Sequence, residues 1–148
     1  DPRWGGGAAG AERHASFARL KRALRALEGE HRMHNFAPQA RLSPHDAAAR
    51  RFVYRLRCTA EPAPGVRAVT AAVDALLAGQ MQRLVGAAAA VACCQLPEEF
   101  LDSALSAEAL TTVPALPSGT VFLERCVFAK DVHHLLQPLM EGPDARAW

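Results

Sequence analysis

Histidine, arginine and asparagine side chains gather in one short segment, which is the first candidate site for chemistry. They are His31, Arg32, His34 and Asn35. Imidazole and amide groups can exchange hydrogen bonds with RNA, or they can brace the loop that carries them. Two histidines three residues apart can also bind a metal, but no third ligand lies near them, so we expect no metal site.

Three arginines form a second candidate site, on a segment that alternates as a β-strand does. Every second residue from Phe52 to Cys58 is apolar or aromatic and is expected to face the core. Arg51, Arg55 and Arg57 then share the opposite face, where they could follow a phosphate backbone. The alternative is an edge strand whose charges prevent pairing with another chain.

An α+β domain is the arrangement that we expect to position these candidates. Hydrophobic spacing predicts helices over Ser16–Glu28 and Leu76–Cys94, and Pro97 is suited to begin another. Strands are predicted over Arg51–Thr59, Val66–Val73 and Val121–Phe128. The helices would pack on one face of a mixed or antiparallel sheet. We expect a flexible glycine-rich tail over residues 1–14, the domain over 15–130 and an irregular tail over 131–148.

The long middle helix contains a glycine that its packing must explain. Met81, Leu84, Ala88 and Val91 fall on one face of this helix. Gly86 costs about 1 kcal/mol relative to alanine inside a helix. We therefore expect another stretch of backbone to pass close to Gly86.

Composition limits the classes of function that the chain can serve. The 148 residues carry 17 Lys and Arg against 15 Asp and Glu, a net charge of +2, so a basic surface requires local clustering. The four cysteines lack the spacing of a metal site and are expected to be buried free thiols in a reducing compartment. No apolar run is long enough for a membrane span.

Four segments, read in order, resemble the C-terminal half of the TruA-type tRNA pseudouridine synthases. Gly29–Phe36 is similar to the family's Gly-Thr-His-Asn-Phe-His-Asn-Phe loop, and Arg51–Cys58 is similar to the arginine-led strand that follows it. Gln80–Gly86 resembles a helix motif of the type Gln/Met-Val/Ile-Arg-x-Met/Ile-Val-Gly. Leu116–Phe128 resembles the final Ala-Pro-x-x-Gly-Leu-x-Leu loop and strand.

The resemblance implies a sheet backed by helices, a cleft for tRNA or rRNA, and an isomerase reaction. In that reaction an Asp carboxylate initiates cleavage of the glycosidic bond of uridine, and the base turns and is rejoined through carbon. The reaction uses no cofactor and no metal. The family's catalytic Asp lies in its first half, in a loop of the Arg-Thr/Ser-Asp-x-Gly-Val type.

This chain departs from the family pattern at the positions closest to the chemistry. It has no loop of the catalytic Asp type, so we assign no catalytic residue. Gln82 stands where the family has the arginine beside the catalytic carboxylate, and a neutral amide cannot hold a carboxylate ionised by charge pairing. Arg83 is adjacent and could reach the cleft instead, or it could cap the helix or face solvent. In the final loop Thr120 aligns with the family's glycine, which Gly119 precedes.

Two functional hypotheses follow. The first is a non-catalytic RNA-binding component of a ribonucleoprotein, for instance a mitochondrial ribosome, with RNA and protein partners. The alternative is the C-terminal part of an active tRNA or rRNA pseudouridine synthase that a separate chain completes with its Asp loop. The chain begins with Asp1, so we expect a processed product or part of a longer one. A mitochondrial location is expected, or otherwise another reducing compartment.

Overall fold

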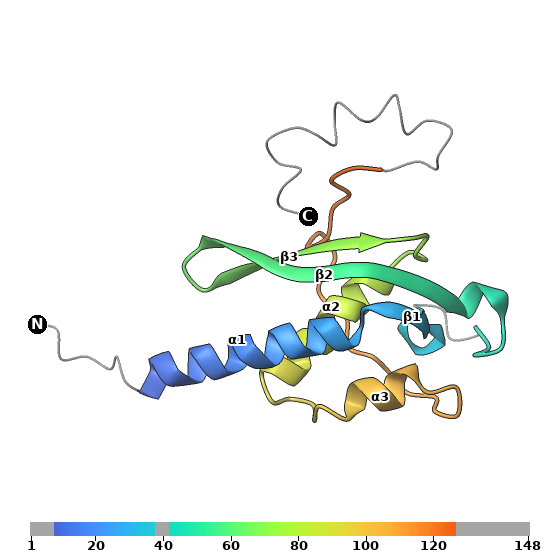
Figure 1. Ribbon diagram of the computed structural model, residues 1–148, viewed down its shortest axis with the longest axis horizontal. Coiled ribbons are helices and arrows are strands. Elements are labelled where there is room, and N and C mark those ends of the chain that lie inside the picture. Colours follow the sequence, from blue (N-terminus) through green and yellow to red (C-terminus); the bar gives the residue numbers. More distant parts are fainter. Residues whose placement is uncertain (1–7, 38–41, 127–148) are drawn as a thin grey trace, which may run out of the picture.

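Helices cover one face of a three-stranded antiparallel sheet in the computed structural model, which describes residues 8–37 and 42–126 (Figure 1). The sheet order is β1-β2-β3, formed by Gly29–Arg32, Arg50–Ala63 and Val66–Val73. The helices are α1 (Ala8–Ala26), α2 (Gln80–Ala92) and α3 (Phe100–Leu105), with short 3-10 turns η1 (His34–Phe36) and η2 (Ala47–Ala49). The expected α+β class with helices on one face of the sheet is confirmed.

The core lies between the helices and the inner face of the sheet. Leu24 of α1 and Leu27, directly after this helix, meet Val53 and Leu56 of β2 there, together with Leu84 of α2. Burying side chains of this size contributes about 1.5–3 kcal/mol each, which fixes the sheet on the helices. Among the described helices, none has both the length and the apolar character to cross a lipid bilayer.

Helix α1 is longer than its hydrophobic stripe predicted. It begins at Ala8, whereas the sequence indicated Ser16, because the preceding turns contain helix-forming alanines and no proline. It ends at Ala26, and Gly29 takes a φ of +102°, which a residue with a side chain rarely adopts. The loop expected after this helix instead opens with strand β1, which pairs with the start of β2.

The long hairpin of β2 and β3 contains irregularities that the alternating sequence does not reveal. The pairing shifts between Val53 and Arg55, where Val53 lies opposite Val73 and Arg55 opposite Ala72. Such a β-bulge adds one residue to one strand and moves the following side chains to the other face. Val53 and Leu56 are both buried as a result, although they are three residues apart.

Helix α2 is shorter than the predicted Leu76–Cys94, but the expected close approach of a backbone is confirmed. A Cβ atom added to Gly86 would lie 2.6 Å from the Pro114 carbonyl oxygen and 3.0 Å from the Leu116 nitrogen. Real Cβ atoms do not come that close to fixed backbone. Leu84, Ala88 and Val91 of the expected stripe are buried, and Met81 is partly buried.

Two expectations for the later part of the chain are wrong. Residues 121–126 form no strand, with Phe122 and Leu123 exposed, while residues 127 and 128 lie outside the described ranges, as do residues 1–7 and the tail 131–148. The thiols of Cys93, Cys94 and Cys126 are exposed, and only Cys58 is partly buried. Cys93 and Cys94 follow the last residue of α2, where the chain turns outward with a φ of +56° at Cys94.

Candidate nucleic-acid interface

The start of α2 is the place where three of the four resembling segments meet. Gln80 is fully buried there. Its side-chain oxygen accepts a hydrogen bond from the Leu77 nitrogen at 2.7 Å, and its amide nitrogen donates to the Met33 carbonyl at 3.3 Å. One glutamine therefore joins the helix start to the Gly29–Phe36 segment.

The final resembling segment contacts the same helix. The Leu116 nitrogen donates a hydrogen bond to the Gln82 carbonyl at 3.0 Å. This bond seats the 114–116 backbone against Gly86, where only the lack of a side chain leaves room. The fourth segment is most of β2, which pairs with β1. The fold thus brings all four segments into one connected unit.

His34 and Asn35 lie inside the protein, where they brace a loop. Their exposed fractions are 5% and 9%. The Asn35 amide nitrogen donates to the Ala104 and Ala109 carbonyls, both at 2.9 Å, and its oxygen accepts from the Thr111 nitrogen at 3.0 Å. His34 contributes its Nε2 to the Ala109 carbonyl at 3.1 Å, while its Nδ1 is buried without a partner. Direct RNA contact requires an exposed side chain, so the hydrogen bonds favour the bracing interpretation for both residues.

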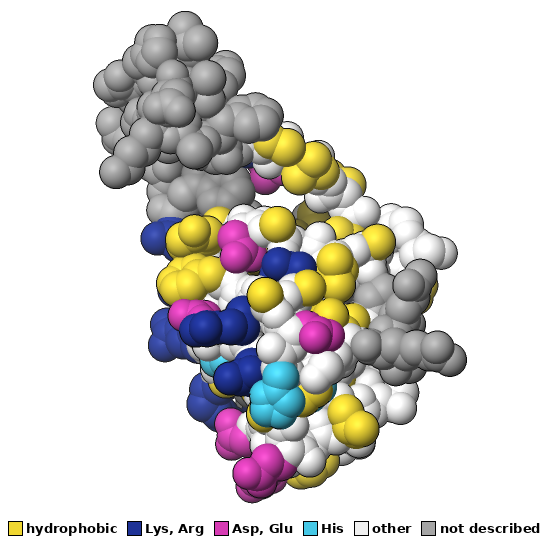
Figure 2. Space-filling model, turned by 90° about the vertical axis from the view of Figure 1, so that its right-hand side faces the viewer, with side chains coloured by type: hydrophobic (Ala, Val, Ile, Leu, Met, Phe, Trp, Pro, Cys, Tyr) yellow, Lys and Arg dark blue, Asp and Glu magenta, His cyan; other side chains and the backbone are white. Residues whose placement is uncertain are grey.

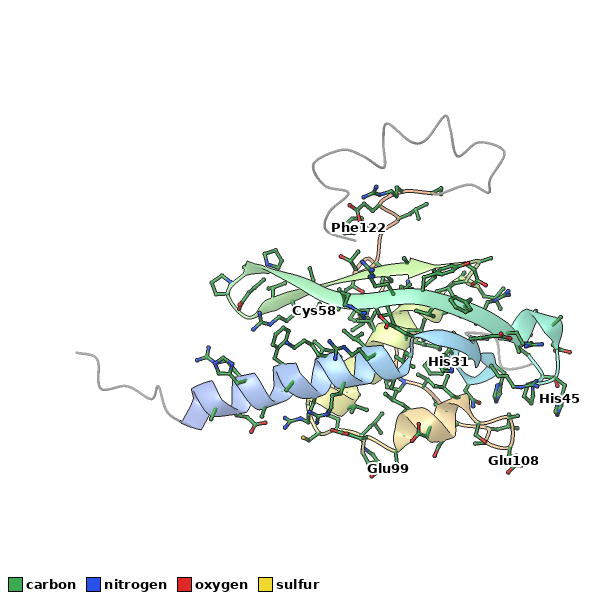
Figure 3. All side chains as sticks on the ribbon, viewed as in Figure 1. His31, His45, Cys58, Glu99, Glu108 and Phe122 are labelled. Atoms are coloured by element: carbon green, nitrogen blue, oxygen red, sulfur yellow. The ribbon has the colours of Figure 1, made fainter. Side chains whose placement is uncertain are left out.

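His31 and Arg32, on the short strand β1, also use their side chains within the protein. Nε2 of His31 lies 2.7 Å from the Glu28 carbonyl, at the junction with α1 (Figure 3). Arg32 donates to the Pro44 carbonyl at 2.6 Å. Both residues are only partly buried, so some of each side chain is still open to solvent. Of the described residues, no group of three or more His, Cys, Asp or Glu side chains could hold a metal ion.

Neither of the two α2 positions that the resemblance singles out, Gln82 and Arg83, offers a positive charge to the position of the family's arginine. Gln82 is neutral and partly exposed. Arg83 turns back along its own helix, where its guanidinium lies 3.4 Å from the Gly79 carbonyl. Arg83 does not cap the start of α2, because a guanidinium only donates and the free backbone groups of a helix start are N–H donors. It also does not take over the position of Gln82.

The three candidate arginines of β2, Arg51, Arg55 and Arg57, do not share one face, contrary to the sequence-based expectation. Arg51 lies on the side of the buried Val53, and its Nε atom is buried without a partner. Beyond the bulge, Arg55 and Arg57 alternate with the buried Leu56 and so lie on the outer face. The single extra residue of the bulge separates Arg51 from the other two.

Two exposed aromatic rings occupy the outer face, where the sequence had predicted core residues. Phe52 and Tyr54 are 38% and 64% exposed, and their ring centroids lie 4.7 Å apart with the planes tilted by 49°. Strict alternation predicts that Phe52 and Tyr54 lie on the same face as Leu56. The bulge between Val53 and Arg55 puts them on the opposite face, and the sequence does not reveal its position. Figure 2 shows hydrophobic and Lys or Arg side chains side by side along one edge of the molecule.

Charges on the outer face are partly neutralised. Arg50 forms an ion pair with Glu30, and the Arg50 Nε donates to the Glu30 carboxylate at 2.7 Å. Glu30 belongs to β1 and lies opposite Phe52 of β2. Arg57 pairs with Glu28 at the end of α1. Arg55 is partly buried, lies opposite Ala72 and forms no hydrogen bond or ion pair within the described ranges. It is therefore the arginine of this face whose charge is available to a ligand.

Shifts in pKa lie away from these residues, along the hairpin and on α1, where a hydrogen bond to Glu12 raises the pKa of Arg19. Burial raises the pKa of the Cys58 thiol, and the nearby Arg67 opposes this. The Gly65 backbone N–H, followed by Arg67, lowers the pKa of Glu61 at the hairpin turn. None of these groups is one of the outer-face side chains Phe52, Tyr54 and Arg55.

Comparison with known proteins finds no family model and no curated protein that matches the chain. The contacts and charges of the surface itself therefore carry the functional conclusion.

Proposed function

We propose that this chain is an RNA-binding domain of pseudouridine synthase-like type that does not catalyse uridine isomerisation by itself. In a cell it would serve as a structural component of a ribonucleoprotein. The resemblance of four segments supports the fold type, as does the meeting of three of them at α2. The function itself is inferred from the outer face of the sheet, because a fold alone does not imply a function.

The outer face of the sheet is the observation that carries the proposal. The described helices leave it uncovered, and it presents Phe52 and Tyr54 beside the guanidinium of Arg55, which has no partner among residues 8–37 and 42–126. Exposed aromatic rings next to arginine are typical of surfaces that bind RNA, where rings contact bases and guanidinium groups contact phosphates. Arginine is well suited to this because it pairs with phosphate through two donors.

The absence of catalysis is argued from the neutral side chain of Gln82. A carboxylate brought to this position would meet an amide in place of a permanent positive charge, and nothing there would keep it ionised. The neighbouring cation, Arg83, is engaged with the Gly79 carbonyl. The nucleophilic step would therefore lack its supporting charge even if another chain supplied an Asp.

Binding of the whole chain to a tRNA transcript, measured by fluorescence anisotropy over a range of salt concentrations, tests the proposal. Affinity should fall as salt rises, because phosphate contacts release counterions. Arg55→Ala should weaken binding and reduce the slope of log K against log salt by about 1. Arg22→Ala is the matched control, since Arg22 lies on α1 and is paired with Glu98 at 2.6 Å. Equal effects of the two changes, or no binding, would contradict the proposal.

Incubation of the same RNA with the chain, followed by nucleoside mass analysis, tests the lack of catalysis. We expect no pseudouridine. Its formation by the chain alone would overturn the non-catalytic assignment. Its formation only after addition of a chain with an Asp loop would establish the enzymatic alternative.

A further inference from the structure

We propose that Phe52 and Tyr54 form a stacking platform for unpaired bases, which makes the chain a reader of single-stranded RNA. This inference rests on the proposed RNA-binding function and adds the class of RNA that the surface selects. Bases in an RNA duplex are already stacked on each other and present only their edges in the grooves. A ring platform can therefore receive only bases that are free to leave a helix.

The two rings present an accessible aromatic surface of suitable shape. They belong to residues two apart on one strand, so both project from the same face of the sheet. Their planes are tilted by 49°, so the pair does not form a closed parallel stack. Tyr54, with 64% of its surface exposed, offers the larger free area to a base.

The backbone beneath the rings is held in place. The Phe52 nitrogen donates to a carboxylate oxygen of Asp74 at 3.1 Å, and the Asp74 nitrogen donates to the Phe52 carbonyl at 3.1 Å. Paired strands on both sides of Val53 add further restraint. A platform fixed in this way loses little conformational freedom when a ligand binds.

The charges around the platform indicate the path of the phosphate backbone. On the β1 side, Glu30 lies across from Phe52 and binds Arg50, so this side is closed to a phosphate. On the β3 side, Arg55 lies opposite the small Ala72 and has no partner within the described part of the chain. We therefore place a phosphate at Arg55 and the adjoining base on Tyr54.

A protein partner is the less favoured occupant. A protein partner would have to supply a carboxylate to Arg55, yet Asp and Glu are depleted at protein interfaces, whereas RNA offers a phosphate at every nucleotide. The apolar side chains with larger exposed fractions lie on other segments; they are Leu110, Phe122 and Leu123. Figure 3 shows Phe122 on the segment that rises beyond β3, away from the helical layer.

The test compares three ligands of about twelve nucleotides, which is within the usual range for single-strand sites. They are an unstructured RNA strand, the same strand annealed to its complement, and an abasic ribose-phosphate strand. The wild-type chain should bind the unstructured strand most tightly. Tyr54→Ala and Phe52→Leu should each weaken that binding by about 5- to 100-fold and leave binding of the other two ligands nearly unchanged.

Two further variants separate a stacking role from a merely structural one. Tyr54→Phe keeps the ring and should bind as the wild type does. Phe122→Ala removes a more exposed ring on another segment, with 85% of its surface accessible, and should have no effect. Equal losses on the abasic strand, or unchanged binding by Tyr54→Ala, would overturn the platform. If Arg55→Ala still lowers the salt slope in that case, the proposed RNA binding survives; if the wild type binds none of the three, both proposals fail.

Discussion

At the scale of single residues, Gly86 shows most clearly how a sequence position determines packing. Its Cα faces the backbone of residues 114–116, with the Pro114 carbonyl oxygen at 2.6 Å from any added Cβ. That backbone cannot easily retreat, because the Leu116 nitrogen is bonded to the Gln82 carbonyl. A glycine that weakens the helix locally thus permits a contact between two distant segments.

We predict that Gly86→Ala destabilises the protein by roughly 1–3 kcal/mol, since overpacking outweighs the gain in helix propensity. The measurement is the urea midpoint followed by circular dichroism. Gly10→Ala is the matched control: this glycine lies in α1 with nothing within 4 Å of its Cβ position, so the change should stabilise by up to about 1 kcal/mol. Stabilisation by both changes would contradict the packing argument.

At the scale of elements, the bulge in β2 determines which side chains reach the outer face. Strict alternation predicted the existence of β2 and β3, the core position of Leu56 and the outward position of Arg57. It failed for Phe52, Tyr54 and Arg51, because the one-residue shift near Arg55 depends on pairing with β3. Pairing is a tertiary property that the sequence of one strand does not contain.

The same reasoning explains the other differences between sequence and structure. The spacing of Leu84, Ala88 and Val91 was sufficient to predict α2 and its buried face. The burial of Asn35 was not predictable, since its partners lie 69 to 76 residues further along the chain. The loop motif correctly drew attention to Asn35, but only the fold distinguishes a bracing amide from a ligand-binding one.

We predict that Asn35→Ala lowers the stability of the fold and leaves RNA affinity unchanged at temperatures where the variant is folded. The substitution removes the side-chain partner of the Thr111 nitrogen and of the Ala104 carbonyl, while the Ala109 carbonyl keeps its contact with His34, and each buried group left unsatisfied costs about 1–3 kcal/mol. Thermal unfolding and anisotropy measure the two quantities separately. A stable variant with weakened RNA binding would show that Asn35 contacts the ligand.

At the scale of the whole molecule, the two layers have different tasks. The helical layer and the inner face of the sheet make the core, and α2 holds the resembling segments together. The outer face carries the exposed rings and the available cation of Arg55. The proposal thus places binding on the face of the sheet opposite the core, so outer-face variants should fold normally.

The most direct test of this account is photo-crosslinking of the chain to a single-stranded RNA that contains 4-thiouridine, with the attachment sites located by mass spectrometry. We predict crosslinks on the β2 segment that contains Phe52, Tyr54 and Arg55, and their loss in Tyr54→Ala. Crosslinks confined to the helical layer, around Arg22 and Glu98, would contradict the central claim that the outer face of the sheet binds RNA.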